Sequence, residues 1–139
     1  MTVERYPSRR KSRKHAIEVV YAALIRGEDP MVLLATTSRA AGWSRHPWFA
    51  YAQELVAGVE RRTEELDEII SGASEKWSVD RMSRTDLAIL RVASFELLEQ
   101  QGVPAAVITS EAAHLAEELS ADDSPRFVQG VLSRIAAQR

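Results

Sequence analysis

The stretch that decides the fold is residues 84–101, RTDLAILRVASFELLEQQ. Wound as an α-helix, it places apolar side chains on nearly its whole circumference. A helix that is apolar all round has to be surrounded by other helices. The stretch is therefore predicted to form the central helix of an all-α bundle. Ser83 is its expected N-cap, and Asp86 follows three residues later, in capping-box spacing.

The polar residues of this central helix raise a separate question. Arg84, Arg91 and Ser94 share one stripe, and Glu96 lies about 140° from Arg91 on the helical wheel. An ionised glutamate on an apolar face needs a partner. Two interpretations stay open: Glu96 accepts hydrogen bonds from backbone donors of a neighbouring helix, or it lines a protein interface.

Almost every other segment of the chain is also predicted to be helical. No segment shows the two-residue alternation of a strand, and glycine or proline stands at most of the expected helix ends. The remaining helices are expected over Ser8–Arg26, Met31–Ala41, Pro47–Gly72 and Pro104–Leu119, and from Ser124, the expected N-cap of the last helix. The predicted fold is a compact all-α bundle of six or seven helices.

Composition bounds what this bundle does. At 139 residues the chain fits one domain, and no run approaches the ~18 apolar residues of a membrane span, so a cytoplasmic protein is expected. With no cysteine, disulfides and thiolate metal sites are excluded. The three histidines lack metal-ligand spacing, and no glycine-rich phosphate loop or nucleophile elbow occurs. We therefore expect no metal, no cofactor and no enzymatic activity.

Charge is distributed unevenly along the chain. Residues 1–15 contain six Lys/Arg against Glu4 alone, a charge of +5, whereas residues 16–139 carry 12 Lys/Arg and 19 Asp/Glu, a charge of −7. A basic arm on an acidic body is typical of a protein that holds an anionic partner at one end. A solvated basic tail with no partner is the alternative.

The first helix combines this basic end with an apolar stripe. Its apolar stripe consists of Ile17, Val20, Tyr21 and Leu24. Four cations continue that line toward the N-terminus: Arg9, Arg10, Arg13 and Lys14. We expect the first two turns to project past the bundle, where arginine forks suit phosphates and Tyr21 suits stacking on an unpaired base. A core position for the Tyr21 ring is the alternative.

Three stretches, in order, resemble the NusB family. The first is RRKSR at 9–13 with Ala16 and Tyr21, and the second is DLAILRVASFEL at 86–97. The third and most specific runs from Val103-Pro104 through Glu111-Ala112 and Asp123-Ser124 to FVQGVL at 127–132. Together they cover about residues 8–136. The resemblance implies two perpendicular helical subdomains, at about 8–72 and 77–138, with residues 1–7 flexible.

The resemblance also implies a function. Members of the family bind the boxA element of nascent ribosomal RNA as a single strand, together with the ribosomal protein NusE, and help RNA polymerase resist termination. It adds Asp123 and Phe127 to the RNA-binding residues, and it places Asp86 and Arg91 at the surface that faces NusE. Asp123 at a helix N-terminus and Phe127 in the core are the alternative interpretations.

The sequence departs from the family pattern at Ser110, Glu117 and Gln129, and Glu117 reverses a charge. Two other functions stay open. One is an RNA- or protein-binding module in ribosomal RNA processing, since NusB-like domains also occur fused to ribosomal-RNA methyltransferases. The other is a self-associating helical adaptor, for example a homodimer, whose basic arm contacts only solvent.

Overall fold

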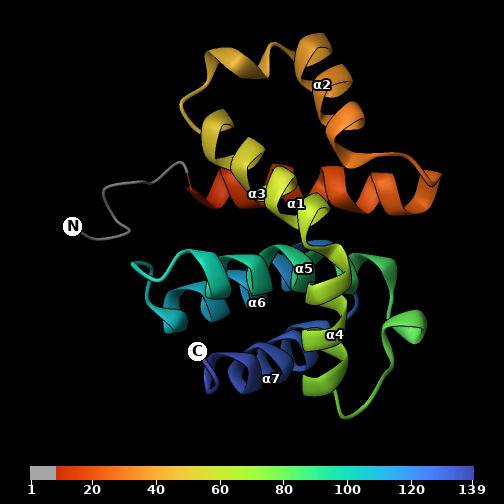
Figure 1. The fold of residues 1–139 in the computed structure, drawn as a ribbon, viewed down its shortest axis with the longest axis vertical. Helices are drawn as coiled ribbons and strands as arrows, with labels where there is room; N and C mark the ends of the chain where they lie inside the picture. Colours follow the sequence, from red (N-terminus) through yellow and green to blue (C-terminus); the bar gives the residue numbers. More distant parts are fainter. Residues whose placement is uncertain (1–8) are drawn as a thin grey trace.

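The computed structural model describes residues 9–139, and within them the chain forms seven α-helices and no strand (Figure 1). The helices are α1 (Arg9–Arg26), α2 (Pro30–Ala41), α3 (Phe49–Arg61), α4 (Thr63–Ala73), α5 (Arg84–Glu99), α6 (Ala105–Leu119) and α7 (Ser124–Ala136), with short 3-10 turns η2 (Trp43–Arg45) and η3 (Val79–Arg81). The all-α prediction is confirmed. The predicted flexibility of residues 1–7 concerns a segment outside the described residues.

Helix α5 is the centre of the bundle, as its apolar circumference predicted. It packs against α1, α3, α4, α6 and α7. Of its sixteen residues, eleven are buried. Its N-cap is also as predicted, because the Asp86 N–H donates to the Ser83 Oγ over 3.0 Å. The Asp86 carboxylate, however, does not complete a capping box; it accepts hydrogen bonds from the hydroxyls of Ser120 and Ser124.

The single long helix predicted over Pro47–Gly72 is wrong. The backbone of Arg62 leaves the helical region at φ −117°, ψ 22°, and separates α3 from α4. Thr63 contributes to the break because its hydroxyl donates to the Val59 carbonyl over 2.6 Å, a back-bonding contact that bends helices. Pro47 lies in the turn before α3, and Gly72 lies inside α4.

The break lets α4 turn away from the first three helices. In Figure 1, α1, α2 and α3 form the upper half of the molecule, and α5, α6 and α7 the lower half. Helix α4 packs against α5 and α7 of the lower half. One hydrophobic core joins the two halves, and the predicted subdomain boundary near residue 72 stays a prediction. No helix in residues 9–139 has the length and apolar character needed to cross a membrane.

Candidate nucleic-acid interface

The basic half of α1 lies alongside α6. Arg10 donates to both carboxylate oxygens of Glu111, from Nε over 2.9 Å and from Nη2 over 2.6 Å. One turn later, the Lys14 Nζ lies 2.6 Å from the Glu118 Oε1. Because residue numbers rise together along these pairs, α1 and α6 run side by side in the same direction. The prediction that the first turns of α1 project past the bundle is therefore wrong.

Arg13 lies between these two residues but faces inward. Its guanidinium binds the Glu96 carboxylate of α5 with two hydrogen bonds of 2.7 and 3.0 Å. The side chains of Arg13 and Glu96 are only 4% and 1% exposed. The Tyr51 hydroxyl of α3 donates to the same carboxylate over 2.6 Å. Glu96 is therefore bound by neighbouring helices, but the backbone donors that were expected are wrong: the donors are the side chains of Arg13 and Tyr51.

This network extends to the start of α1. The guanidinium carbon of Arg9 lies 3.9 Å from the centroid of the Tyr51 ring. Burial raises the pKa of the Tyr51 hydroxyl, and the adjacent Glu96 carboxylate raises it further, so the phenol stays a neutral donor. Arg9, Tyr51, Glu96 and Arg13 thus fix the N-terminal turns of α1 onto α3 and α5.

Arg10, Arg13 and Lys14 are each paired with a carboxylate of another helix. The three residues differ in how accessible their side chains are. Arg10 and Lys14 keep 56% and 37% of their side chains exposed. Arg13 is enclosed, and it would meet RNA only if its buried ion pair opened. RNA contact by these residues stays a prediction. The geometry favours contact by the two exposed residues, Arg10 and Lys14.

Because of the ion pairs on α6, the stability of the protein depends on pH. Hydrogen bonds from Arg10 hold the pKa of the Glu111 carboxyl below its ordinary value of 4.5, and a hydrogen bond from Lys14 does the same for Glu118. A lowered pKa in the folded state contributes stability above the unfolded value, and this contribution disappears as the pH falls through the folded value. We expect the urea midpoint of Glu111→Gln to fall less than that of the wild type between about pH 5 and pH 3. Parallel curves for the two proteins would contradict this.

At the other end of the α1–α6 pair lies the connection between α6 and α7. Tyr21 follows Lys14 by two helical turns, and its side chain is exposed. Residues 120–123 follow Glu118 in the same direction. Asp86 of α5 holds this connection in place. Its buried carboxylate accepts hydrogen bonds from the Ser120 Oγ over 2.9 Å and from the Ser124 Oγ over 3.1 Å. Tyr21 and the α6–α7 connection therefore share one end of the molecule.

The two residues predicted to extend the RNA surface differ in access. Asp123 is 79% exposed, and its Oδ2 lies 3.8 Å from the Lys76 Nζ. Phe127 is partly buried and packs against the hydrophobic core. Ser124 does not cap α7 as expected, because its hydroxyl is bonded to Asp86. RNA contact by Asp123 and Phe127 stays a prediction. The Asp123 carboxylate is the more accessible of the two groups.

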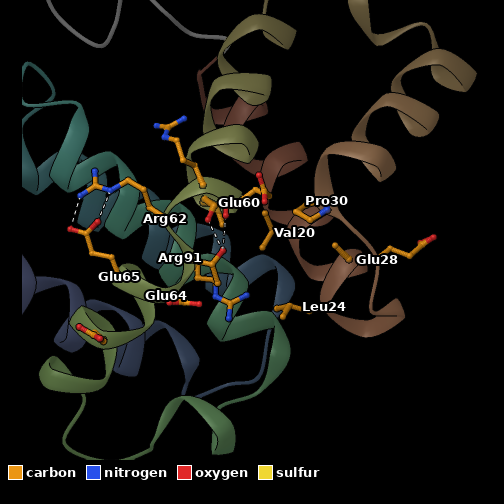
Figure 2. Close-up of a pocket in the computed structure, with 14 residues that line it drawn as sticks. Val20, Leu24, Glu28, Pro30, Glu60, Arg62, Glu64, Glu65 and Arg91 are labelled. Atoms are coloured by element: carbon orange, nitrogen blue, oxygen red, sulfur yellow. Dashed lines mark hydrogen bonds and ion pairs between the residues drawn. The ribbon is translucent and has the colours of Figure 1, made fainter.

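The two residues predicted to face a protein partner, Asp86 and Arg91, are both on α5 and have little exposed surface. Asp86 is buried. Arg91 is 11% exposed and binds the Asp67 carboxylate with two hydrogen bonds of 2.8 and 2.7 Å. Arg91 also lines a groove of about 770 Å³ between the C-terminal half of α1 and the α3–α4 junction (Figure 2). The groove combines an apolar part with carboxylates, and its lining includes Val20, Leu24, Val59, Glu28, Glu60, Glu64, Glu65 and Glu68.

Within residues 9–139, no group of three or more histidine or carboxylate side chains is arranged to hold a metal ion. The site is thus built from ion pairs, one exposed tyrosine and a positioned connection between helices.

Comparison with known proteins supports one family. Residues 10–137 match the model of the NusB family. The transcription antitermination protein NusB of Salinispora tropica is 42% identical over 130 residues, which cover 94% of this chain and 96% of the relative. The structure of Thermotoga maritima NusB superposes with a TM-score of 0.84 at 29% identity, over 94% of this chain and 92% of that one. A crystal structure of antitermination factors NusB and NusE in complex with double-stranded RNA contains a chain with a TM-score of 0.86 and 26% identity, over 96% of this chain and 99% of that one.

Proposed function

Because the chain belongs to the NusB family, we propose that its α1–α6 face binds boxA-type single-stranded RNA together with a NusE-type ribosomal protein. The protein is a transcription antitermination factor, and its family is not enzymatic. In this proposal it acts in the cytoplasm on nascent ribosomal RNA, as part of the antitermination complex of RNA polymerase.

The observation that carries the proposal is that two exposed cations of α1, Arg10 and Lys14, are each paired with a carboxylate of α6. The Lys14–Glu118 pair is exposed on both sides and contributes about 0–1 kcal/mol, so a phosphate can replace Glu118 at little cost. Replacing Glu111 costs more, because its carboxylate is 16% exposed, binds Arg10 with two hydrogen bonds and lies 3.6 Å from the Arg13 Nη1. Arginine and lysine both bind phosphate strongly, and a helix N-terminus adds to the attraction. The buried Arg13–Glu96 pair stays closed and holds α1 in position for this exchange.

Base recognition falls to the other end of the same face. The exposed ring of Tyr21 offers a surface on which an unpaired base can stack, and the Asp123 carboxylate can accept from an exocyclic amine. Phe127 contributes the exposed part of its ring. A strand that follows α1 from Arg10 past Lys14 would reach these groups in turn.

For the protein partner, we propose the groove beside Arg91. Arg91 forms part of its wall, and Asp86 acts indirectly by holding the α6–α7 connection in place. Three of the groove's carboxylates, on Glu60, Glu64 and Glu68, have no cationic partner among residues 9–139. The lining contains five glutamates against three arginines, Arg61, Arg62 and Arg91, so the groove has a net negative charge beside its apolar side chains, which suits a basic partner segment.

A titration of labelled boxA-type RNA at several salt concentrations tests the RNA proposal. Three to four neutralised phosphates predict a slope of log affinity against log salt of roughly −2 to −3 for a single strand. Replacing both Arg10 and Lys14 by Ala should weaken binding and make the slope shallower by about 1.4. Arg26→Ala, an exposed arginine at the far end of α1, is the matched control and should bind like the wild type.

A flat salt response, or equal weakening by Arg26→Ala, would rule out this RNA site. Adding the NusE-type protein to the titration tests the partner, because an adaptor should bind RNA more tightly in its presence. The remaining alternative, a self-associating module, predicts a stable dimer in light scattering that RNA does not change.

A further inference from the structure

Among the tyrosine, tryptophan and phenylalanine rings of residues 9–139, two are exposed, and only one of them was expected to contact RNA. They are Tyr21, at 38%, and Trp77, at 42%. Trp77 lies in the connection between α4 and η3. The tryptophan side chain gains more free energy from burial than any other side chain. An indole that is 42% exposed therefore indicates a binding partner.

The connection that carries Trp77 is held in place. The Ser74 hydroxyl donates to the Trp77 carbonyl and accepts from the Trp77 N–H over 3.2 Å. Arg134 of α7 donates to the Ala73 carbonyl and lies 3.8 Å from the Glu75 carboxylate. A backbone already fixed in this way loses little further entropy when a ligand binds.

A single ammonium connects Trp77 to the proposed RNA surface. The Lys76 Nζ lies 5.6 Å from the centroid of the Trp77 ring and 3.8 Å from the Asp123 Oδ2. Trp77 therefore stands beside the α6–α7 connection. Tyr21 lies at the same end of the molecule, because α1 and α6 run in the same direction. Lys76 thus joins the exposed Trp77 ring to the exposed Asp123 carboxylate.

We propose that Trp77 is a stacking platform for an unpaired base of the RNA that the α1–α6 face binds, with Lys76 contacting a neighbouring phosphate. The inference rests on the proposed function and extends its site to the α4–η3 connection. An indole stacks on any base, and a phosphate attracts Lys76 away from Asp123, which frees that carboxylate to meet a base. A protein partner covering Trp77 is the competing occupant, and RNA is favoured by the cation beside the ring.

Trp77 is its own reporter in the full-length protein. Trp48 is buried, with its ring stacked 4.2 Å from that of His15, and Trp43 packs against the same pair of rings. The neutral quencher acrylamide should therefore report mainly on Trp77, and Trp77→Phe gives the background of the other two. Saturating boxA-type RNA should change the Trp77 emission and protect it from acrylamide.

Binding measurements separate stacking from charge. Trp77→Ala should weaken RNA binding roughly tenfold without changing the salt slope, whereas Trp77→Phe should retain most of the affinity. Lys76→Ala should make the slope shallower by about 0.7. Val32→Ala, which removes an exposed apolar side chain of α2, is the control and should have no effect.

The outcomes distinguish the two proposals. If RNA binds with the expected salt dependence while Trp77 stays open to acrylamide and Trp77→Ala binds normally, the platform is wrong and the α1–α6 site stands. If the NusE-type protein protects Trp77 and RNA alone does not, the platform is also wrong, and Trp77 belongs to a protein interface. If no RNA binds at all, the proposed function itself fails.

Discussion

Replacing Arg13 by Ala is expected to lower the free energy of unfolding by about 3–5 kcal/mol. The substitution leaves the Glu96 carboxyl group buried without its guanidinium partner, and the Tyr51 hydroxyl is its one remaining donor among residues 9–139. Removing one partner of a buried ion pair costs far more than the pair itself contributes, because the other charge stays out of water. Urea denaturation followed by circular dichroism measures the loss.

Two comparisons make this result specific to burial. Lys14→Ala removes a cation from the next residue of the same helix, where the ion pair is exposed, and should cost no more than about 1 kcal/mol. Arg13→Met combined with Glu96→Gln removes both charges, keeps an acceptor for Tyr51, and should recover most of the stability. Equal losses from Arg13→Ala and Lys14→Ala would show that the Arg13–Glu96 pair is not a buried element of the fold.

Replacing Gly58 by Ala is expected to destabilise the protein by about 3 kcal/mol. Gly58 lies where α3 packs against α5, and a Cβ on it would overlap the Phe95 ring. Phe95 is only 2% exposed, so the ring has no solvent to move into and α3 would have to shift. The effect arises from overpacking, since alanine itself favours helix.

The same substitution elsewhere should have the opposite sign. Gly72 lies inside α4, and a Cβ there would meet nothing within 4 Å. Gly72→Ala should therefore stabilise the protein by about 0.5–1 kcal/mol. Phe95→Leu combined with Gly58→Ala should recover part of the loss at Gly58. A Gly58→Ala protein as stable as the wild type would mean that α3 and α5 are not in close contact.

The bundle could be predicted from sequence because its central helix has only one stable environment. The apolar circumference of residues 84–101 requires neighbours on all sides, and α5 has them. The α3–α4 break could not be predicted in the same way. Both helices bury apolar faces, so the pattern continues through Arg62 and hides the change of direction.

The site was harder to predict because it depends on two helices that are far apart in sequence. On the helical wheel, Arg13 falls close to the buried residues Ile17 and Val20. The sequence of α1 alone, however, does not show that Glu96 of α5 is the partner of Arg13. Glu111 and Glu118 lie two turns apart on α6, whereas Arg10 and Lys14 lie one turn apart on α1, so residue spacing did not reveal the ion pairs. Trp77 carried no signal beyond its exposure, which only the structure shows.

We propose that RNA replaces Glu111 and Glu118 as the partners of Arg10 and Lys14. The affinity of a Glu111→Gln, Glu118→Gln double variant for boxA-type RNA tests this exchange, measured beside the wild type at one salt concentration. Because both amides keep the shape of the side chains and remove the competing charges, the variant should bind RNA more tightly than the wild type. Unchanged or weaker binding would contradict it, because the carboxylates would then not compete with phosphate at this face.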